Sequence, residues 1–152
     1  MGPYKARDVA KHIIDLRKDQ KDTLTPLQLL KIVYLCHGWM LGKFGRPLVE
    51  EEFEAWQYGP VLRDLYSAIK DFGSKPVTKI DNAKDIELDP QEKRLIEVVT
   101  NFYAKYDGLR LSALTHAPDS PWDTAWKMAG KNTIMSNDLI ENYYSSQVNP
   151  NG

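Results

Sequence analysis

Residues 25–44 are apolar on almost every side, and this segment constrains the fold more than any other part of the chain. A helix at the surface of a domain carries one apolar stripe, whereas a helix that is apolar nearly all round has to be covered on most sides. After Thr25, the strongly polar side chains in the segment are Gln28, Lys31, His37 and Lys43. The sequence therefore predicts a mainly α-helical domain around a buried central helix at about 25–44.

The ends of the central helix are marked by local signals. Thr25 and Gln28 have the spacing of a capping box, and Gly45 follows the last apolar residue. Within the helix, Gly38 and Gly42 are four residues apart and share one face. Each glycine costs about 1 kcal/mol relative to alanine inside a helix. We expect the close approach of a neighbouring helix to offset this cost.

The composition indicates one globular domain without an excess of charge. The 152 residues are 42% hydrophobic and 27% charged, which is enough apolar material for an ordinary core. Twenty Lys and Arg residues against 21 Asp and Glu residues give a net charge of −1. Nucleic-acid-binding proteins usually show a basic excess or a basic stripe, so the sequence argues against nucleic acid as a partner.

The cysteine content and the N-terminal residues indicate the cytoplasm. Cys36 is the one cysteine, which excludes an internal disulfide and is typical of a reducing compartment. The N-terminal segment lacks the apolar core of a signal peptide, and Lys31, His37 and Lys43 argue against a membrane-spanning central helix. We therefore predict a cytoplasmic protein with no membrane partner.

Further helices are predicted around the central one from apolar spacing, capping residues and glycine stops. They cover residues 4–18, 60–72, 90–107, 110–115, 120–130 and 136–146, with Phe102 and Tyr106 on the buried face of the third. A strand is expected at 53–57, paired in a small two-stranded β element with residues 77–80. No linker divides the chain, so residues 1–146 are predicted to form one domain and residues 147–152 a disordered tail.

Residues that usually carry catalysis or bind metals form no coherent pattern. The three histidines are scattered and offer none of the compact ligand pairs of a zinc site. Cys36 lies in the most apolar helix, where a buried cysteine behaves as a small hydrophobic residue. His116, Asp119 and Ser120 lie within five residues of one another, but catalytic triads assemble in space, and Ser120 is placed to cap a helix. The sequence predicts no enzyme, no metal and no cofactor.

Four aromatic residues are candidates for an interaction surface. Trp56, Tyr58, Trp122 and Trp126 belong to two segments with the character of short or irregular elements beside the core. Tryptophan and tyrosine supply large contact area together with one polar group, and they are frequent in protein–protein hot spots. The alternative is that they pack these short elements onto the domain, and the sequence leaves both roles open. Trp39, within the central helix, is assigned to the core.

Three blocks of sequence carry a resemblance to a known family. They are KIVYLCHGWMLGKFGRPL, EAWQYGPVLRDLY and LSALTHAPDSPW, in this order. The most specific parts are the AW-x-YGPV motif at 55–61 and the LT-H…PW motif at 114–122. Over about residues 24–144 the chain resembles the Panacea domain, which belongs to an antitoxin family that includes SocA-like and GepA-like, often phage-associated, proteins.

The resemblance implies a mainly helical domain that neutralises a cognate protein toxin, encoded by a neighbouring gene, by binding it. In the SocA-like branch it further implies an adaptor role, in which the antitoxin delivers its toxin to an ATP-dependent Clp-type protease. The family supplies no catalytic residues to carry over. Steric neutralisation and protease delivery both stay open, as does the oligomeric state.

The leading hypothesis is an antitoxin that binds its toxin through segments 53–60 and 116–126. The residues expected to contact the toxin or to shape the contact surface are Trp56, Tyr58, Pro60, His116, Trp122 and Trp126. The alternative is a DNA-binding autoregulator of its own operon, against which the even spread of basic residues argues. A third hypothesis, an enzyme that uses His116, Asp119 and Cys36, has the least support.

Overall fold

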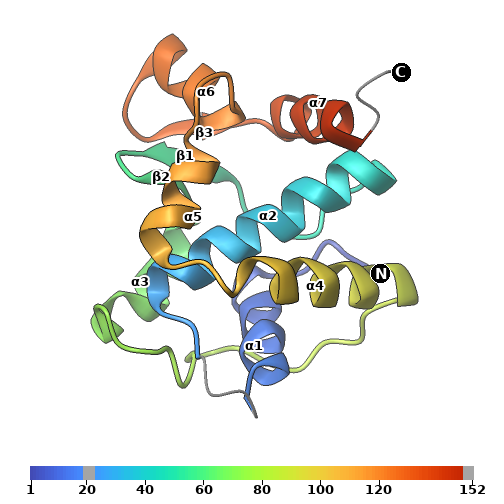
Figure 1. The fold of residues 1–152 in the computed structure, drawn as a ribbon. Coiled ribbons are helices and arrows are strands. Elements are labelled where there is room, and N and C mark those ends of the chain that lie inside the picture. Colours follow the sequence, from blue (N-terminus) through green and yellow to red (C-terminus); the bar gives the residue numbers. More distant parts are fainter. Residues whose placement is uncertain (19–22, 149–152) are drawn as a thin grey trace.

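The computed structural model describes residues 1–18 and 23–148, and within them the chain is mainly α-helical with one small sheet (Figure 1). The helices are α1 (Ala6–Leu16), α2 (Pro26–Phe44), α3 (Arg63–Ile69), α4 (Pro90–Tyr103), α5 (Gly108–Thr115), α6 (Pro121–Ala129) and α7 (Asn137–Val148). The 3₁₀ turn η1 (Lys70–Phe72) follows α3, and the strands are β1 (Phe53–Trp56), β2 (Gly59–Val61) and β3 (Thr133–Met135). The predicted fold class is confirmed.

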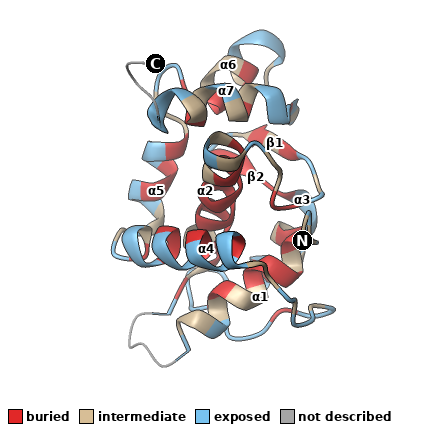
Figure 2. Ribbon diagram, turned by 90° about the vertical axis from the view of Figure 1, so that its right-hand side faces the viewer, coloured by how far each residue is buried: buried red, intermediate tan, exposed pale blue. Residues whose placement is uncertain are grey.

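Helix α2 runs through the middle of the molecule, with the other elements arranged around it (Figure 2). The predicted central helix is confirmed, including its ends. Thr25 and Gln28 make both hydrogen bonds of the capping box, and Gly45 follows the helix in the left-handed conformation with φ of 71°. Buried side chains from the other six described helices and from the sheet join those of α2 in one hydrophobic core. We infer that these elements fold as one domain.

The two glycines of α2 face α7, as close helix packing requires. A Cβ atom added to Gly38 would lie 2.5 Å from the ring of Tyr144, and one added to Gly42 would lie 2.6 Å from the backbone carbonyl carbon of Tyr144. Real Cβ atoms essentially never approach another heavy atom this closely. The expectation that a neighbouring helix approaches the glycine face is therefore confirmed, and α7 is that helix.

His37, also in α2, hydrogen-bonds to two other segments, the one at residues 48–49 and the start of α7. Its Nδ1 atom accepts from the backbone amides of Leu48 and Val49 at 3.3 and 3.2 Å. Because Nδ1 is an acceptor, Nε2 carries the proton and donates to the side-chain oxygen of Asn137 at 2.9 Å. Burial lowers the pKa of His37 to about 4, which keeps the ring in the neutral form that this arrangement needs.

The small sheet has β1 in its centre, in the order β2-β1-β3, and both pairs are antiparallel. The strand predicted at 53–57 is confirmed, but its predicted pairing with residues 77–80 is wrong. Val77 instead donates its amide to the carbonyl of Leu24 at 2.8 Å and buries its side chain in the core. The true partners are three-residue segments, which are too short to show the alternating pattern of a strand.

Two predicted helix boundaries are wrong. Pro60 does not begin a helix; it lies in β2, opposite Ala55, and α3 begins at Arg63. Proline has a fixed φ and no amide proton, and both properties suit an edge strand as well as a first helical turn. Helix α4 ends at Tyr103 rather than at 107.

Phe102 was predicted to lie on the buried face of α4 but is 52% exposed. Glu92, Ile96 and Thr100 are fully buried and mark the centre of the buried face. This face is rotated by about one residue from the predicted one, so that Phe102 falls at its edge. Because Glu92 and Thr100 at the centre of this face are polar, the spacing of apolar residues does not show where the face lies.

The C-terminal prediction is also partly wrong. Gln147 and Val148, predicted to begin a disordered tail, belong to α7, and residues 149–152 lie outside the described part of the chain. Among the described residues, no helix has the length and apolar character needed to cross a membrane.

Candidate protein-binding surface

The six residues predicted to contact or shape a partner site come together where the β1–β2 hairpin meets α5 and α6, on the left of Figure 1. Trp56 and Pro60 lie in the two strands, Tyr58 lies in the turn between them, His116 follows α5, and Trp122 and Trp126 are one turn apart on α6. We refer to these six residues as the aromatic surface. Its members come from segments about sixty residues apart in the sequence.

Two hydrogen bonds tie the hairpin to the helices. The indole N–H of Trp122 donates to the backbone carbonyl of Trp56 at 2.6 Å, and the hydroxyl of Ser112, on α5, donates to the carbonyl of Tyr58. Since Ser112 has a single hydroxyl proton, Nδ1 of His116 is the donor in its 3.3 Å contact with that hydroxyl. A chain of polar contacts therefore runs from His116 to the tip of the hairpin and holds its backbone in place.

The two indole rings on α6 are stacked on each other, and the ring of His116 packs against that of Trp122 at an angle of 60°. Trp122 and Trp126 are stacked with centroids 4.9 Å apart and planes 20° apart, and the ring of His116 lies 5.2 Å from that of Trp122. Stacked pairs of this kind contribute about 0.5–1.5 kcal/mol beyond the area they bury. The stack therefore fixes the orientation of Trp126 relative to the hairpin.

The six side chains differ in what they offer a partner. Tyr58 is 62% exposed at the tip of the hairpin. Trp56, His116 and Trp126 are half-buried, whereas Pro60 and Trp122 are buried. Pro60 and Trp122 are thus suited to shaping the surface, and the other four present atoms to solvent. That a partner binds here stays a prediction.

A buried lysine supports the hairpin from below. Lys31, in α2, is fully buried, and its ammonium donates to the carbonyl of Pro60 at 2.9 Å. Gly59 lies directly over it: a Cβ atom there would sit 3.1 Å from Nζ of Lys31 and 3.1 Å from the hydroxyl of Thr115. Burial lowers the pKa of Lys31 to about 7. The side chain therefore changes between its charged and its neutral form close to neutral pH, directly beneath the candidate site.

Trp56 is held at its edge by a small polar cluster. Its indole N–H donates to a carboxylate oxygen of Glu54 at 3.1 Å, and the same carboxylate forms an ion pair with Arg63 at 2.9 Å. The guanidinium of Arg63 lies 5.4 Å from the centre of the Trp56 ring, and the ring of Tyr66 packs against Trp56 edge-on at 5.2 Å. The hydrogen bond from Arg63 lowers the pKa of Glu54, which keeps the carboxylate charged.

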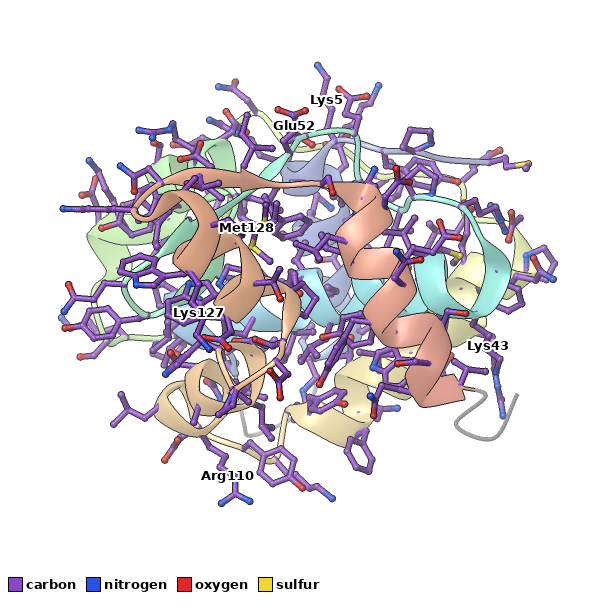
Figure 3. The ribbon with its side chains drawn as sticks, turned by 90° about the horizontal axis from the view of Figure 1, so that it is seen from above. Lys5, Lys43, Glu52, Arg110, Lys127 and Met128 are labelled. Carbon is purple, nitrogen blue, oxygen red and sulfur yellow. The ribbon has the colours of Figure 1, made fainter. Side chains whose placement is uncertain are left out.

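Sequence reasoning missed several residues of this region. Lys31 and Ser112 act through backbone atoms of a hairpin whose position no local pattern reveals. Met128, on α6, is 81% exposed and is labelled in Figure 3, which views the molecule from the side that α6 and α7 cover. The exposure of Met128 could have been predicted from the helical spacing, because this residue falls outside the stripe of Trp122 and Trp126 on the same helix.

Cys36 and His116 of the enzyme hypothesis, and the neighbouring Ser120, have structural roles. The third residue of that hypothesis, Asp119, donates its backbone amide to the carboxylate of Asp123 at 2.9 Å. Cys36 is fully buried, and burial raises the pKa of its thiol to about 12, which disfavours the reactive thiolate. The hydroxyl of Ser120 accepts the amide of Asp123 at 3.2 Å and so caps α6, as predicted. The ring of His116 hydrogen-bonds to Ser112. Among the described residues, no group of three or more His, Cys, Asp or Glu side chains is arranged to hold a metal ion.

The fold and this surface define a mainly α-helical domain that presents a short hairpin against two helices. The family described as "Antitoxin SocA-like, Panacea domain" matches residues 29–123, which include most of α2, the hairpin, α3, α4, α5 and the start of α6. The chain belongs to this family.

One curated relative is the protein named "Antitoxin SocA" of Caulobacter vibrioides (strain NA1000 / CB15N). It is 31% identical over 137 residues, an alignment that covers 84% of this chain and 73% of the relative. No solved structure matches the chain significantly. The similarity reaches beyond the matched family segment, so the relative is alike over most of the domain.

Proposed function

We propose that this protein is an antitoxin that neutralises a cognate protein toxin by binding it directly through the aromatic surface. Membership of the SocA-like family supports the antitoxin role. The single observation that supports this choice of surface is the exposed Tyr58 at the tip of a hairpin anchored on both sides by hydrogen bonds. The toxin would be the product of a neighbouring gene, and both proteins would act in the cytoplasm.

The physical argument is preorganisation. Association loses affinity when loops and long side chains have to be ordered at the interface. Here one carbonyl group just before the hairpin turn and one within it are already hydrogen-bonded to Trp122 and Ser112, and Trp126 is already stacked. Tyr58 and Trp126 then supply aromatic contact area at little further entropic cost, which is typical of hot-spot residues.

We propose steric neutralisation without catalysis by the antitoxin itself. Delivery of the toxin to a Clp-type protease would need a second contact surface in addition to the one that holds the toxin. The DNA-binding alternative is disfavoured because several basic side chains already form ion pairs, among them Arg46 with Asp89 and Glu92, and Lys127 with Asp123. Such pairs leave fewer cations for contacts to phosphate.

The test is co-expression with the adjacent gene, followed by affinity purification of this chain and a growth assay. We expect a stoichiometric complex and rescued growth with the unchanged chain. The double variant Tyr58→Ala/Trp126→Ala should lose the complex and the rescue while keeping its helical circular dichroism spectrum, because Tyr58 is exposed and Trp126 is only half-buried.

Phe102→Ala is the matched control, since Phe102 is an aromatic residue of similar exposure to Tyr58 but lies on α4. We expect this variant to bind and rescue as well as the unchanged chain. Recovery of the chain without its neighbour would contradict the antitoxin proposal. A complex that survives the double variant but not Phe102→Ala would move the interface to α4.

A further inference from the structure

A second surface lies away from the aromatic surface, in a groove between the C-terminal half of α2 and helix α4. The groove has a volume of about 680 Å³. Trp39 and Phe44 of α2 line one side, and Val98 and Phe102 of α4 line the other. Trp39, assigned to the core from the sequence, is only partly buried for this reason. Val98 and Phe102 are 50% and 52% exposed, so much of the apolar wall of α4 meets solvent.

The charges in this groove are of one sign. Lys43 and Arg94 are the ionisable cations that line it, and no Asp or Glu is among its lining residues. In the described part of the chain, neither Lys43 nor Arg94 forms an ion pair with a carboxylate. Lys105 extends the positive rim, with its ammonium 4.4 Å from the centre of the Phe102 ring. An apolar wall with a positive rim favours an occupant that is apolar and negatively charged.

The dimensions suit a helix. The lining residues of α4 run from Pro90 to Tyr103, which spans about 20 Å at 1.5 Å per residue. Val98 and Phe102 are one turn apart and form a ridge along this length. A long groove with such a ridge matches the mode in which an amphipathic helix lays its apolar face against a helical partner.

We propose that the α2–α4 groove binds an amphipathic helical segment of a second protein whose apolar stripe is flanked by carboxylates. A second copy of this chain fits less well, because a symmetric pair would bring the like charges of Lys43, Arg94 and Lys105 towards one another across the interface. The carboxylates of a foreign segment would pair with these cations, while its apolar stripe would cover Val98 and Phe102.

The groove and the aromatic surface use different parts of α2. Lys31, beneath the hairpin, and Lys43, in the groove, are twelve residues apart, or about 18 Å along the helix. Figure 3 shows Lys43 towards the right edge of the molecule, whereas Lys127 and Met128 of α6 lie left of its centre. One chain therefore has room to hold two partners at once, and the groove proposal does not depend on the toxin.

The test uses the full chain and two synthetic helical peptides, each about four turns long, with the same leucine stripe. One peptide carries glutamates beside the stripe and the other carries lysines at the same positions. Fluorescence anisotropy of the labelled peptides should show the acidic peptide binding at least about tenfold more tightly at low salt. This preference should shrink as salt is added, because the cations are at the surface.

Charge-reversal variants make the test specific for the groove. Lys43→Glu/Arg94→Glu should weaken the acidic peptide at least about tenfold and favour the basic one. Phe102→Ala should weaken both peptides. Lys131→Glu is the matched control, since Lys131 is an exposed lysine outside the groove, and it should change neither affinity beyond a small long-range effect. Circular dichroism and thermal unfolding check that each variant is folded.

Three results would overturn the proposal. They are equal affinity for the two peptides, no binding of the acidic peptide up to about millimolar concentration, and binding that the groove variants leave unchanged. Sedimentation of the chain alone addresses the other occupant. A dimer that Phe102→Ala dissociates would assign the groove to a second copy of the chain instead.

Discussion

Helix α2 contacts helix α7 and the β1–β2 hairpin in two different ways. It holds α7 by close packing, with Gly38 and Gly42 against Tyr144 and no room for even a methyl group. It supports the β1–β2 hairpin by a polar contact, with the ammonium of Lys31 under the carbonyl of Pro60. The first contact is set by shape and tolerates no added volume, whereas the second is made by a group whose charge changes near neutral pH. The side of α2 that faces α7 is therefore fixed by close packing. The side that supports the hairpin, and so positions the candidate site, is held by a polar group that can change its charge.

The largest effect is expected where the packing is tightest. Gly42→Ala should destabilise the protein by about 2–3 kcal/mol, because the new Cβ meets the backbone of Tyr144, which cannot rotate away. Better helix propensity would return only about 1 kcal/mol. Urea denaturation measures the change. Lys43→Ala, at an exposed position one residue along the same helix, is the control and should stay within about 0.5 kcal/mol. An unchanged midpoint for Gly42→Ala would mean that α7 moves freely on α2.

The polar side of α2 should respond to pH instead. Burial lowers the pKa of Lys31 from 10.5 to about 7 in the folded protein. Between these values the unfolded chain binds a proton that the folded chain does not, so stability rises with pH across this window and is lost as pH falls towards 7. The expected slope from this residue is about 1 kcal/mol per pH unit.

Lys31→Met tests this slope because it keeps most of the buried volume and removes the ionisable group. Urea denaturation of both chains at several values between pH 7 and pH 9.5 should show the unchanged chain gaining stability relative to the variant as pH rises. Titrations of the remaining lysines and tyrosines largely cancel in the difference between the two chains. Parallel pH profiles would show that Lys31 is protonated in the folded protein throughout, and that the hairpin rests on a charged support.

The smallest effect is expected at the tip of the hairpin. Ser112→Ala removes the donor to the carbonyl of Tyr58 and should cost about 1 kcal/mol of stability. Hydrogen exchange should become faster in residues 57–61, while α2 and α7 keep their protection. Ser67→Ala, at an exposed position on α3, is the control and should leave exchange in the hairpin unchanged. Equal exchange in both variants would show that Trp122 and Lys31 anchor the hairpin without Ser112.

Much of the helical framework was predictable because its signals are local. The capping box at Thr25, the cap at Ser120 and the glycine after Phe44 each act within about four residues. The aromatic surface was predictable only as a set of candidates. Trp56 and Trp122 were named together, but the hydrogen bond that joins them links residues 66 positions apart. Which of the six would be exposed followed from packing, and no periodicity separates Tyr58 from the buried Pro60.

The sequence by itself determined a mainly α-helical domain with α2 at its centre, because an all-round apolar helix has to be enclosed and its ends are capped by its own neighbours. Tertiary structure decided the partners of β1, the burial of Lys31 beneath the hairpin and the groove beside α4. The pairing of Phe53 with Met135 joins residues 82 positions apart. Strand pairing, burial of a polar group and the gap between two helices all depend on which distant segments meet, and local sequence carries no record of that.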